Sequence, residues 1–289
     1  MPHFNSLLSE GTGTLRARTV FPSVSAPAWC AVLCSQGPPE SGILGNEWTP
    51  EPCWTDPPSD EPLGGIDKGA REALLPLKPG SEGGEFNAMP PSNGRGKVPE
   101  TMWVVAKDAF AARGETCRTA AVLGWDWIHH LCADCDVLIR DKDDEEAAEA
   151  MAQLIRSHEP PDLMFLHLDE VDHAGHDHGW GSAQYFAAMH DADRRLGLLL
   201  EALRSAGLLE ETFVVVIADH GGFEQDHGGF TQVELFVPFV VRGPGVLRGR
   251  KLAEDVVCVS LLDVAPTALA SLGVRPGRWM RGRVVEECF

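Results

Sequence analysis

Carboxylate and imidazole side chains gather at two places in the sequence, each just beyond a short apolar segment. They are Asp172, His176, Asp219, His220 and His227. Mixed carboxylate and imidazole ligands are typical of Zn²⁺ and similar divalent cations. Three protein ligands per ion leave one position open for water or substrate, so the pattern predicts a catalytic metal site. A histidine-rich surface loop is the alternative interpretation.

The two apolar segments that precede these residues lie at 162–168 and 212–218. Neither alternates between polar and apolar residues, which is typical of strands that are buried on both faces, as in a parallel sheet. Ligands of such sheets bind beyond the carboxyl ends of the strands. We therefore expect both strands to bring their polar residues to one edge of the sheet.

Other periodic segments predict the surrounding elements. Helices are expected within 2–19, with a turn at Gly11–Gly13, and at 25–33, 103–113, 141–157, 182–206 and 260–272, and further strands at 118–123 and 235–242. Strands that alternate with long helices are typical of the α/β class with a mostly parallel sheet flanked by helices. We expect one domain over residues 1–289, with a disordered, Pro- and Gly-rich insertion at 47–99.

The charge of the chain restricts its partners. Its 43 acidic and 24 basic residues give a net charge of −19. We therefore expect no nucleic-acid-binding surface, and no apolar run reaches the roughly 20 residues that a membrane-spanning helix needs. The first residues do not have the pattern of a secretory signal peptide. An acidic protein that binds an anionic substrate needs local positive charge, which bound divalent cations supply.

The motifs together resemble those of the type I phosphodiesterase/nucleotide pyrophosphatase family, within the alkaline phosphatase superfamily. The matching elements are Asp172 to His176, Asp219 to Gly222, His227 with Gly228, and the C-terminal segments 241–245 and 260–267. They occur in the order that the family has. The resemblance implies an alkaline-phosphatase-like three-layer sandwich.

The resemblance also implies two divalent cations, with Zn²⁺ as the first choice and Mn²⁺ as the second. Their ligands would be Asp172, His176 and His227 for one ion and Asp219 and His220, together with the nucleophile, for the other. The nucleophile position falls on Ser25, and Asn46 stands where the family has an asparagine that donates to the phosphoryl oxygen. A metal-coordinated serine could attack phosphorus and form a phosphoserine, which water then hydrolyses.

The chain departs from the family pattern at its start. The family begins with a strand that ends in Asp-Gly and supplies a carboxylate to the second ion. Residues 1–4 resemble the helix that follows this strand. The resemblance therefore implies a sheet that lacks its first strand and a second ion that has one charged ligand fewer.

Three functions are consistent with these residues. The first is metal-dependent hydrolysis of a small-molecule phosphate ester, either a phosphodiester or a nucleotide pyrophosphate. The second is a sulfatase or phosphonate hydrolase of the same superfamily, although Trp29 stands where the sulfatase motif C/S-x-P-x-R has its Arg. The third is a catalytically inactive binding module, which the missing N-terminal Asp favours. The sequence does not indicate the leaving group, the oligomeric state or the compartment.

Overall fold

The computed structural model describes residues 1–50, 98–252 and 257–289. The strands are β1 (Thr12–Arg18), β2 (Thr119–Val122), β3 (Val137–Ile139), β4 (Leu163–Leu166), β5 (Val214–Ile217), β6 (Phe236–Arg242) and β7 (Arg250–Lys251). The α-helices are α1 (Pro2–Glu10), α2 (Ser25–Cys34), α3 (Pro38–Ser41), α5 (Met102–Ala111), α6 (His129–Cys132), α7 (Asp144–Ile155), α8 (Glu170–His178), α9 (Ala183–Ser205), α10 (Gln232–Leu235) and α11 (Val264–Ser271). The 3₁₀ helices are η1 (Asp126–Ile128), η2 (Leu261–Asp263) and η3 (Glu286–Cys288). Most of the insertion predicted at 47–99 lies outside the described residues.

The described strands form two sheets, in the orders β5-β6-β1-β7 and β3-β2-β4. β2 runs parallel to β3 and β4, and β1 runs parallel to β7. β6 runs antiparallel to both β1 and β5. The predicted α/β class is confirmed, but the prediction that 212–218 forms a parallel strand is wrong. Its continuous apolar run reflects burial on both faces, which does not depend on the direction of the neighbouring strand.

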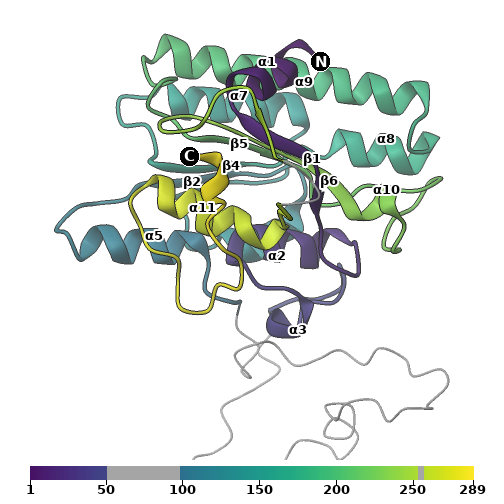
Figure 1. Cartoon of the computed structure of the whole chain (residues 1–289), viewed down its shortest axis with the longest axis horizontal. Helices are drawn as coiled ribbons and strands as arrows, with labels where there is room; N and C mark the ends of the chain where they lie inside the picture. The colour runs from purple at the N-terminus through teal and green to yellow at the C-terminus, as the bar shows by residue number, and fades with distance from the viewer. Residues whose placement is uncertain (51–97, 253–256) are drawn as a thin grey trace, which may run out of the picture.

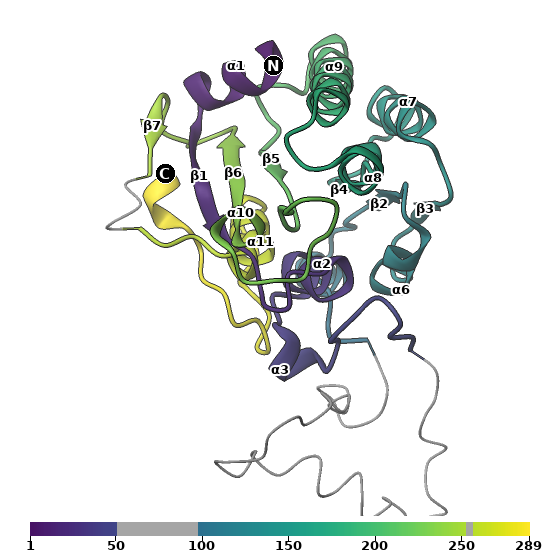
Figure 2. The same ribbon diagram turned by 90° about the vertical axis from the view of Figure 1, so that its right-hand side faces the viewer.

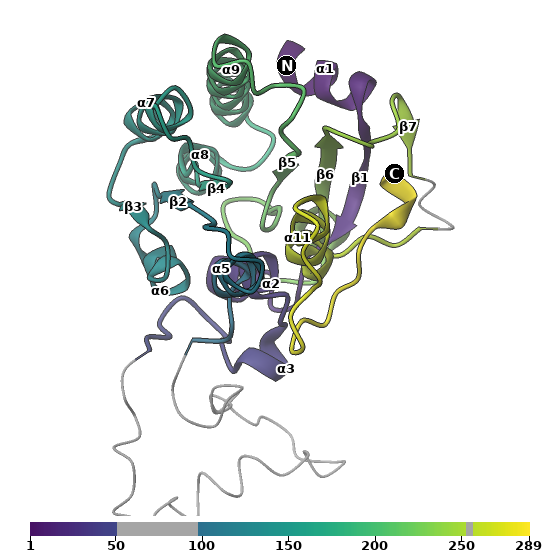
Figure 3. The same ribbon diagram turned by 90° about the vertical axis from the view of Figure 1, so that its left-hand side faces the viewer.

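Helices cover the strands on two sides, which gives the three layers that were predicted (Figure 1). α1, α7 and α9 lie on one side, and α2, α5 and α11 lie on the other. Figures 2 and 3 show the same layers from the two ends of the molecule. α1 packs on α9 and β6, whereas α11 packs on α2 and α5. Among the described helices, none combines the length and the apolar character that crossing a bilayer requires.

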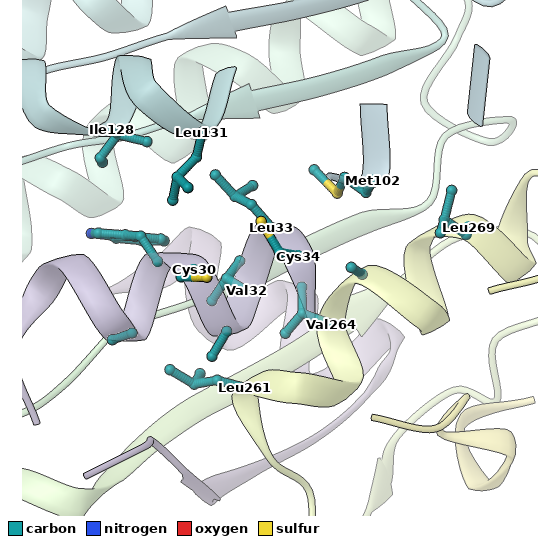
Figure 4. Close-up of a cluster of buried hydrophobic side chains, with 14 of the residues drawn as sticks. Cys30, Val32, Leu33, Cys34, Met102, Ile128, Leu131, Leu261, Val264 and Leu269 are labelled. Atoms are coloured by element: carbon teal, nitrogen blue, oxygen red, sulfur yellow. The ribbon is translucent and has the colours of Figure 1, made fainter. Parts of the chain in front are cut away.

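Helix α2 is buried over nearly its whole length, since every residue from Ala26 to Cys34 is buried. Figure 4 shows its side chains between those of α6 and α11, with Leu33 near Leu131 and Val32 near Leu261. A helix held on all sides by close packing cannot shift without loss of contacts. Ser25, its first residue, is therefore held in a fixed position relative to the sheets.

The prediction for residues 2–19 is only partly correct, because Thr12–Arg18 forms strand β1 rather than a continuation of the turn. β1 lies inside its sheet, between β6 and β7. Gly11 directly precedes β1. A Cβ atom at this position would collide with the backbone oxygen of Val241. The glycines that predicted a turn are therefore explained by the close approach of the backbone to β6.

Candidate functional site

Three of the predicted metal ligands lie together. Asp172 and His176 are one turn apart on α8, and the loop that follows β5 brings His227 to them. Asp172 Oδ2 lies 3.3 Å from His176 Nε2, and Asp172 Oδ1 lies 4.0 Å from His227 Nε2. One ligand atom from each residue lies within 4.8 Å of the other two. Groups at this spacing could share a single ion.

The imidazole rings of this region are oriented by backbone carbonyls. His176 Nδ1 lies 2.9 Å from the oxygen of Gln225, and His227 Nδ1 lies 3.1 Å from the oxygen of Ser23. His220 Nδ1 lies 2.9 Å from the oxygen of Gly221. A carbonyl can only accept, so each Nδ1 carries a proton, and in the neutral ring the Nε2 atom then offers a lone pair. Metal-ligating histidines are oriented in this way.

The Asp172 carboxylate also fits a cation. Its Oδ1 atom is buried and has no hydrogen-bond partner. A buried carboxylate oxygen without a partner costs free energy that a bound cation would recover. Among the described residues that line the adjoining cavity there is no Lys or Arg. A bound cation would supply the positive charge that these side chains lack.

A second group of ligand-type atoms contains Ser25, His220 and Asp219. Ser25 Oγ lies 3.1 Å from His220 Nε2, which in turn lies 3.3 Å from Asp219 Oδ2. The His220 ring stacks on the His227 ring, with 3.8 Å between their centroids, so the two groups are adjacent. Burial raises the pKa of Asp219, and the negative charge of Asp172 adds to this effect. A cation bound here would counteract both effects.

Asn46 lies beside the nucleophile candidate. Its Oδ1 accepts a hydrogen bond of 2.9 Å from the backbone N–H of Ala26, the residue after Ser25. This bond uses the carbonyl end of the amide and leaves the two N–H donors of Nδ2 for another acceptor. In the same turn Pro27 has no N–H and the Ala28 N–H bonds to the oxygen of Val24, which leaves the N–H of Ser25 to favour a negative charge in front of this residue.

Residues that the sequence did not single out hold the His227 loop in place. The buried Glu234 carboxylate accepts hydrogen bonds of 2.7 Å from Gly229 N–H and 3.1 Å from Thr231 N–H. Glu234 also closes a capping box at the start of α10 with Thr231. The spacing Thr-x-x-Glu is a recognisable signal of a helix start, and it is the signal that could have identified Glu234.

Trp180 explains two of the motif glycines. A Cβ at Gly175 or at Gly222 would collide with the indole ring of Trp180. The same ring packs edge-on against His176, with 5.1 Å between centroids. The glycines therefore leave room for an aromatic side chain that supports a candidate ligand, and the pattern of glycines alone did not reveal this partner.

His167 and Asp169 follow β4 and lie beside the candidate ligands. His167 Nδ1 accepts a hydrogen bond of 3.2 Å from Trp125 N–H, and Asp169 Oδ2 lies 3.2 Å from His173 Nε2. Burial lowers the pKa of His167 to about 3 and raises that of Asp169 to about 6. In each group burial stabilises the neutral form relative to the charged form.

Acid is expected to destabilise the protein through His167. Below about pH 6.5 the unfolded chain binds a proton at this residue, whereas the folded chain, with a pKa of about 3, does not. The free energy of unfolding should therefore fall by ~2 kcal/mol between pH 7 and pH 5 from this residue alone. His167→Asn keeps an acceptor for Trp125 N–H and removes the titration. Urea unfolding at both pH values should show a smaller pH effect in the variant, and an equal effect would contradict the assignment.

The amino-acid sequence matches a family model and is similar to characterised proteins over part of its length. The model described as "Type I phosphodiesterase / nucleotide pyrophosphatase" matches residues 1–229. Arylsulfatase K of Xenopus laevis is 34% identical over 98 residues, which are 32% of this chain and 18% of that protein. Arylsulfatase K of Danio rerio is 36% identical over 97 residues, with the same two shares. The chain thus matches less than a fifth of the length of these relatives.

Solved structures resemble the fold over nearly the whole chain. Murine ectonucleotide pyrophosphatase/phosphodiesterase 5, an inactive variant in complex with AMP, has a TM-score of 0.66 at 14% identity, and the match covers 96% of this chain and 90% of that chain. A 2-O GAG sulfatase has a TM-score of 0.61 at 15% identity, with 97% and 67% covered. At these identities the likeness shows the alkaline-phosphatase-like fold and nothing finer.

Proposed function

Because the chain belongs to the type I phosphodiesterase/nucleotide pyrophosphatase family, we propose that it hydrolyses phosphodiester or nucleotide pyrophosphate bonds with the help of divalent cations. Residues 1–289 would contribute a single catalytic domain. The observation that carries the proposal is the position of Ser25. Its Oγ lies 3.1 Å from His220 Nε2, next to the cluster of Asp172, His176 and His227.

The donor set fits two borderline cations such as Zn²⁺, with Mn²⁺ as the alternative. Asp172, His176 and His227 would hold one ion, and Asp219 and His220 with Ser25 would hold the other. When bound, such ions lower the pKa of a coordinated hydroxyl and offset the negative charge of a phosphate. The support for this proposal is that backbone carbonyls hold the Nδ1 atoms of the three imidazoles, which turns their Nε2 atoms toward the carboxylates, and that the buried Asp172 Oδ1 has no hydrogen-bond partner.

The chain's own residues would position the two steps of the reaction. Ser25 Oγ forms a bond to phosphorus while the bond from phosphorus to the leaving-group oxygen breaks. Water then attacks the same phosphorus, and the bond to Ser25 Oγ breaks. The first turn of α2 and the amide of Asn46 would donate hydrogen bonds to the non-bridging oxygens, where negative charge gathers.

Arylsulfatase K relatives raise the second candidate, a sulfatase. Trp29 argues against it, because it occupies the position of the sulfatase Arg and is buried, with its ring 5.0 Å from that of His167. We therefore expect kcat/KM for an aryl phosphodiester to exceed that for the matching aryl sulfate by about 100-fold or more, or ~2.7 kcal/mol. Parallel assays with one chromophore measure this ratio, and a ratio below one would favour the sulfatase.

Assays of the same purified protein also test the third candidate, a catalytically inactive binding module. Hydrolysis of the aryl phosphodiester that depends on added Zn²⁺ or Mn²⁺ is the result that the proposal expects. A folded protein that binds neither metal and shows no turnover of the phosphodiester would instead support the inactive module.

A further inference from the structure

Helix α8 carries two of the candidate ligands, Asp172 and His176, but its own sequence does little to anchor it. The structure describes all of its nine residues, and Gly175 is the one that is buried. Short helices are marginal without tertiary contacts, and a buried glycine provides little apolar surface for packing. The position of the two ligands therefore depends on contacts at particular points of the helix.

The start of α8 is capped by a residue from another helix. The side chain of its own N-cap residue, Asp169, makes no capping hydrogen bond. Instead Asp144, the first residue of α7, accepts hydrogen bonds of 2.7 Å from Asp169 N–H and 3.2 Å from Glu170 N–H. A helix leaves the N–H groups of its first turn without partners of its own. The buried carboxylate of Asp144 thus fixes the point at which α8 begins.

Arg195 of α9 connects this carboxylate to α8 from a third helix. Its Nη1 atom lies 2.6 Å from Glu170 Oε2 and 3.6 Å from Asp144 Oδ2, and its Nε atom lies 3.1 Å from Glu145 Oε2. The planar guanidinium group bonds to several carboxylates in a fixed geometry. α9 packs on both α7 and α8, which lie beside it in Figures 2 and 3. One buried side chain therefore links all three helices.

A buried ion pair adds little to the stability of a fold by itself. The free energy of removing two charges from water offsets most of their attraction, and apolar residues of similar volume often stabilise a fold equally well. Asp144 and Arg195 supply what an apolar pair lacks, namely hydrogen bonds of defined direction to the first turn of α8. That turn leads directly to Asp172, and the next turn contains His176.

We propose that Asp144 and Arg195 are positioning residues for the candidate ligands Asp172 and His176. Residues four apart on a helix share one face, so any rotation of α8 would turn both ligands away from His227 together. The ion pair opposes this rotation at the start of the helix. The inference rests on the proposed function, because it takes the triad as a cation site, and it deepens that function by identifying what sets the affinity of the site.

The variant Arg195→Met separates positioning from simple electrostatics. Loss of this positive charge alone should strengthen Zn²⁺ binding, because like charges repel, whereas loss of the group that holds α8 should weaken it. We expect the Zn²⁺ affinity, measured by competition with a chromogenic chelator, to fall about tenfold, since groups that orient ligands affect affinity by 10- to 100-fold. Hydrogen exchange of the metal-free protein should become faster at the amides of 169–176.

Arg242→Met is the matched control. Arg242 is also a buried arginine that pairs with two glutamates, Glu10 and Glu210. It pairs in the sheet with Val214, at the start of β5, whereas the site lies beyond the end of this strand. Its replacement removes the same charge and a comparable ion pair, but it should leave the Zn²⁺ affinity within about twofold of the parent.

The double variant Asp144→Asn/Arg195→Met keeps the test decisive if the single variant does not fold. It removes both buried charges and leaves the net charge of the chain unchanged. Its urea midpoint should be higher than that of Arg195→Met, because no buried charge is left without its partner. Its Zn²⁺ affinity should nevertheless stay about fivefold or more below that of the parent, because an amide cannot replace the carboxylate that accepts two N–H groups.

Several results would overturn the proposal. They are an unchanged or higher Zn²⁺ affinity in Arg195→Met, an equal loss of affinity in Arg242→Met, and unchanged exchange at 169–176. Recovery of affinity together with stability in the double variant would show a purely structural role and would also overturn it. A parent protein that binds no Zn²⁺ would overturn the proposed function and this inference with it, whereas parent and Arg195→Met proteins with the same measurable affinity would overturn the inference alone.

Discussion

Replacement of Ser25 by Ala is expected to lower kcat/KM for an aryl phosphodiester by about 10³-fold or more. The expectation follows from the position of Ser25 Oγ, 3.1 Å from His220 Nε2 at the N-terminus of the buried helix α2. Removal of the hydroxyl removes the nucleophile and leaves the carboxylate and imidazole groups in place. Stopped assays with purified protein that is saturated with Zn²⁺ measure the change.

Two matched variants make this result specific. Ser25→Thr keeps a hydroxyl at the same position and should retain turnover within about tenfold of the parent, or ~1.4 kcal/mol. Ser157→Ala, at an exposed position after the end of α7, should have no effect. Full activity of Ser25→Ala with unchanged Zn²⁺ content would eliminate the phosphoserine route, because alanine has no hydroxyl that could form the covalent bond.

The second large effect is expected from Asp172→Asn, which keeps the shape of the side chain and removes its charge. In the triad of Asp172, His176 and His227, the Asp172 carboxylate contacts both imidazoles. Its Oδ2 lies 3.3 Å from His176 Nε2, and its Oδ1 lies 4.0 Å from His227 Nε2. Loss of the carboxylate should weaken Zn²⁺ binding by about 100-fold or more, because even groups behind the ligands affect affinity by 10- to 100-fold. Titration with a chromogenic chelator measures the affinity, and activity at limiting Zn²⁺ should fall in parallel.

Asp191→Asn is the control for the loss of one negative charge. Asp191 is an exposed residue on α9 that forms a long ion pair with Arg194, with 3.8 Å between Oδ1 and Nε. It changes the net charge by the same amount and should leave Zn²⁺ affinity within about twofold, as expected for a screened surface charge. Treatment of the parent with chelator should abolish hydrolysis, and added Zn²⁺ or Mn²⁺ should restore it. Undiminished Zn²⁺ affinity in Asp172→Asn would mean that the triad is not the binding site.

The sequence predicted much of this arrangement because its strongest signals are local. Helix α2 begins at Ser25, and the strands before Asp172 and Asp219 lie where the apolar runs indicated. Five residues that are separated by up to 55 positions meet beyond the ends of β4 and β5, because α8 and the loop after β5 bring them together. Apolar runs report burial, so they located the strands correctly.

The pairing of strands could not be read in the same way. A run such as 214–217 is apolar because both of its faces are covered, and this holds for parallel and antiparallel neighbours alike. β1 was not predicted because Thr, Gly and Arg make up much of its sequence. Gly11, which precedes it, indicated a turn but lies against β6. Glu234 and Trp180 act through contacts that only the tertiary structure creates. Such partners have no fixed spacing from the residues that they support.

Anomalous diffraction from crystals soaked in Zn²⁺ tests the central claim most directly. The account predicts one peak bonded to Asp172, His176 and His227 at about 2.0–2.2 Å, and a second peak beside Asp219, His220 and Ser25. Crystals that take up zinc only at other side chains, with no peak among Asp172, His176 and His227, would contradict it.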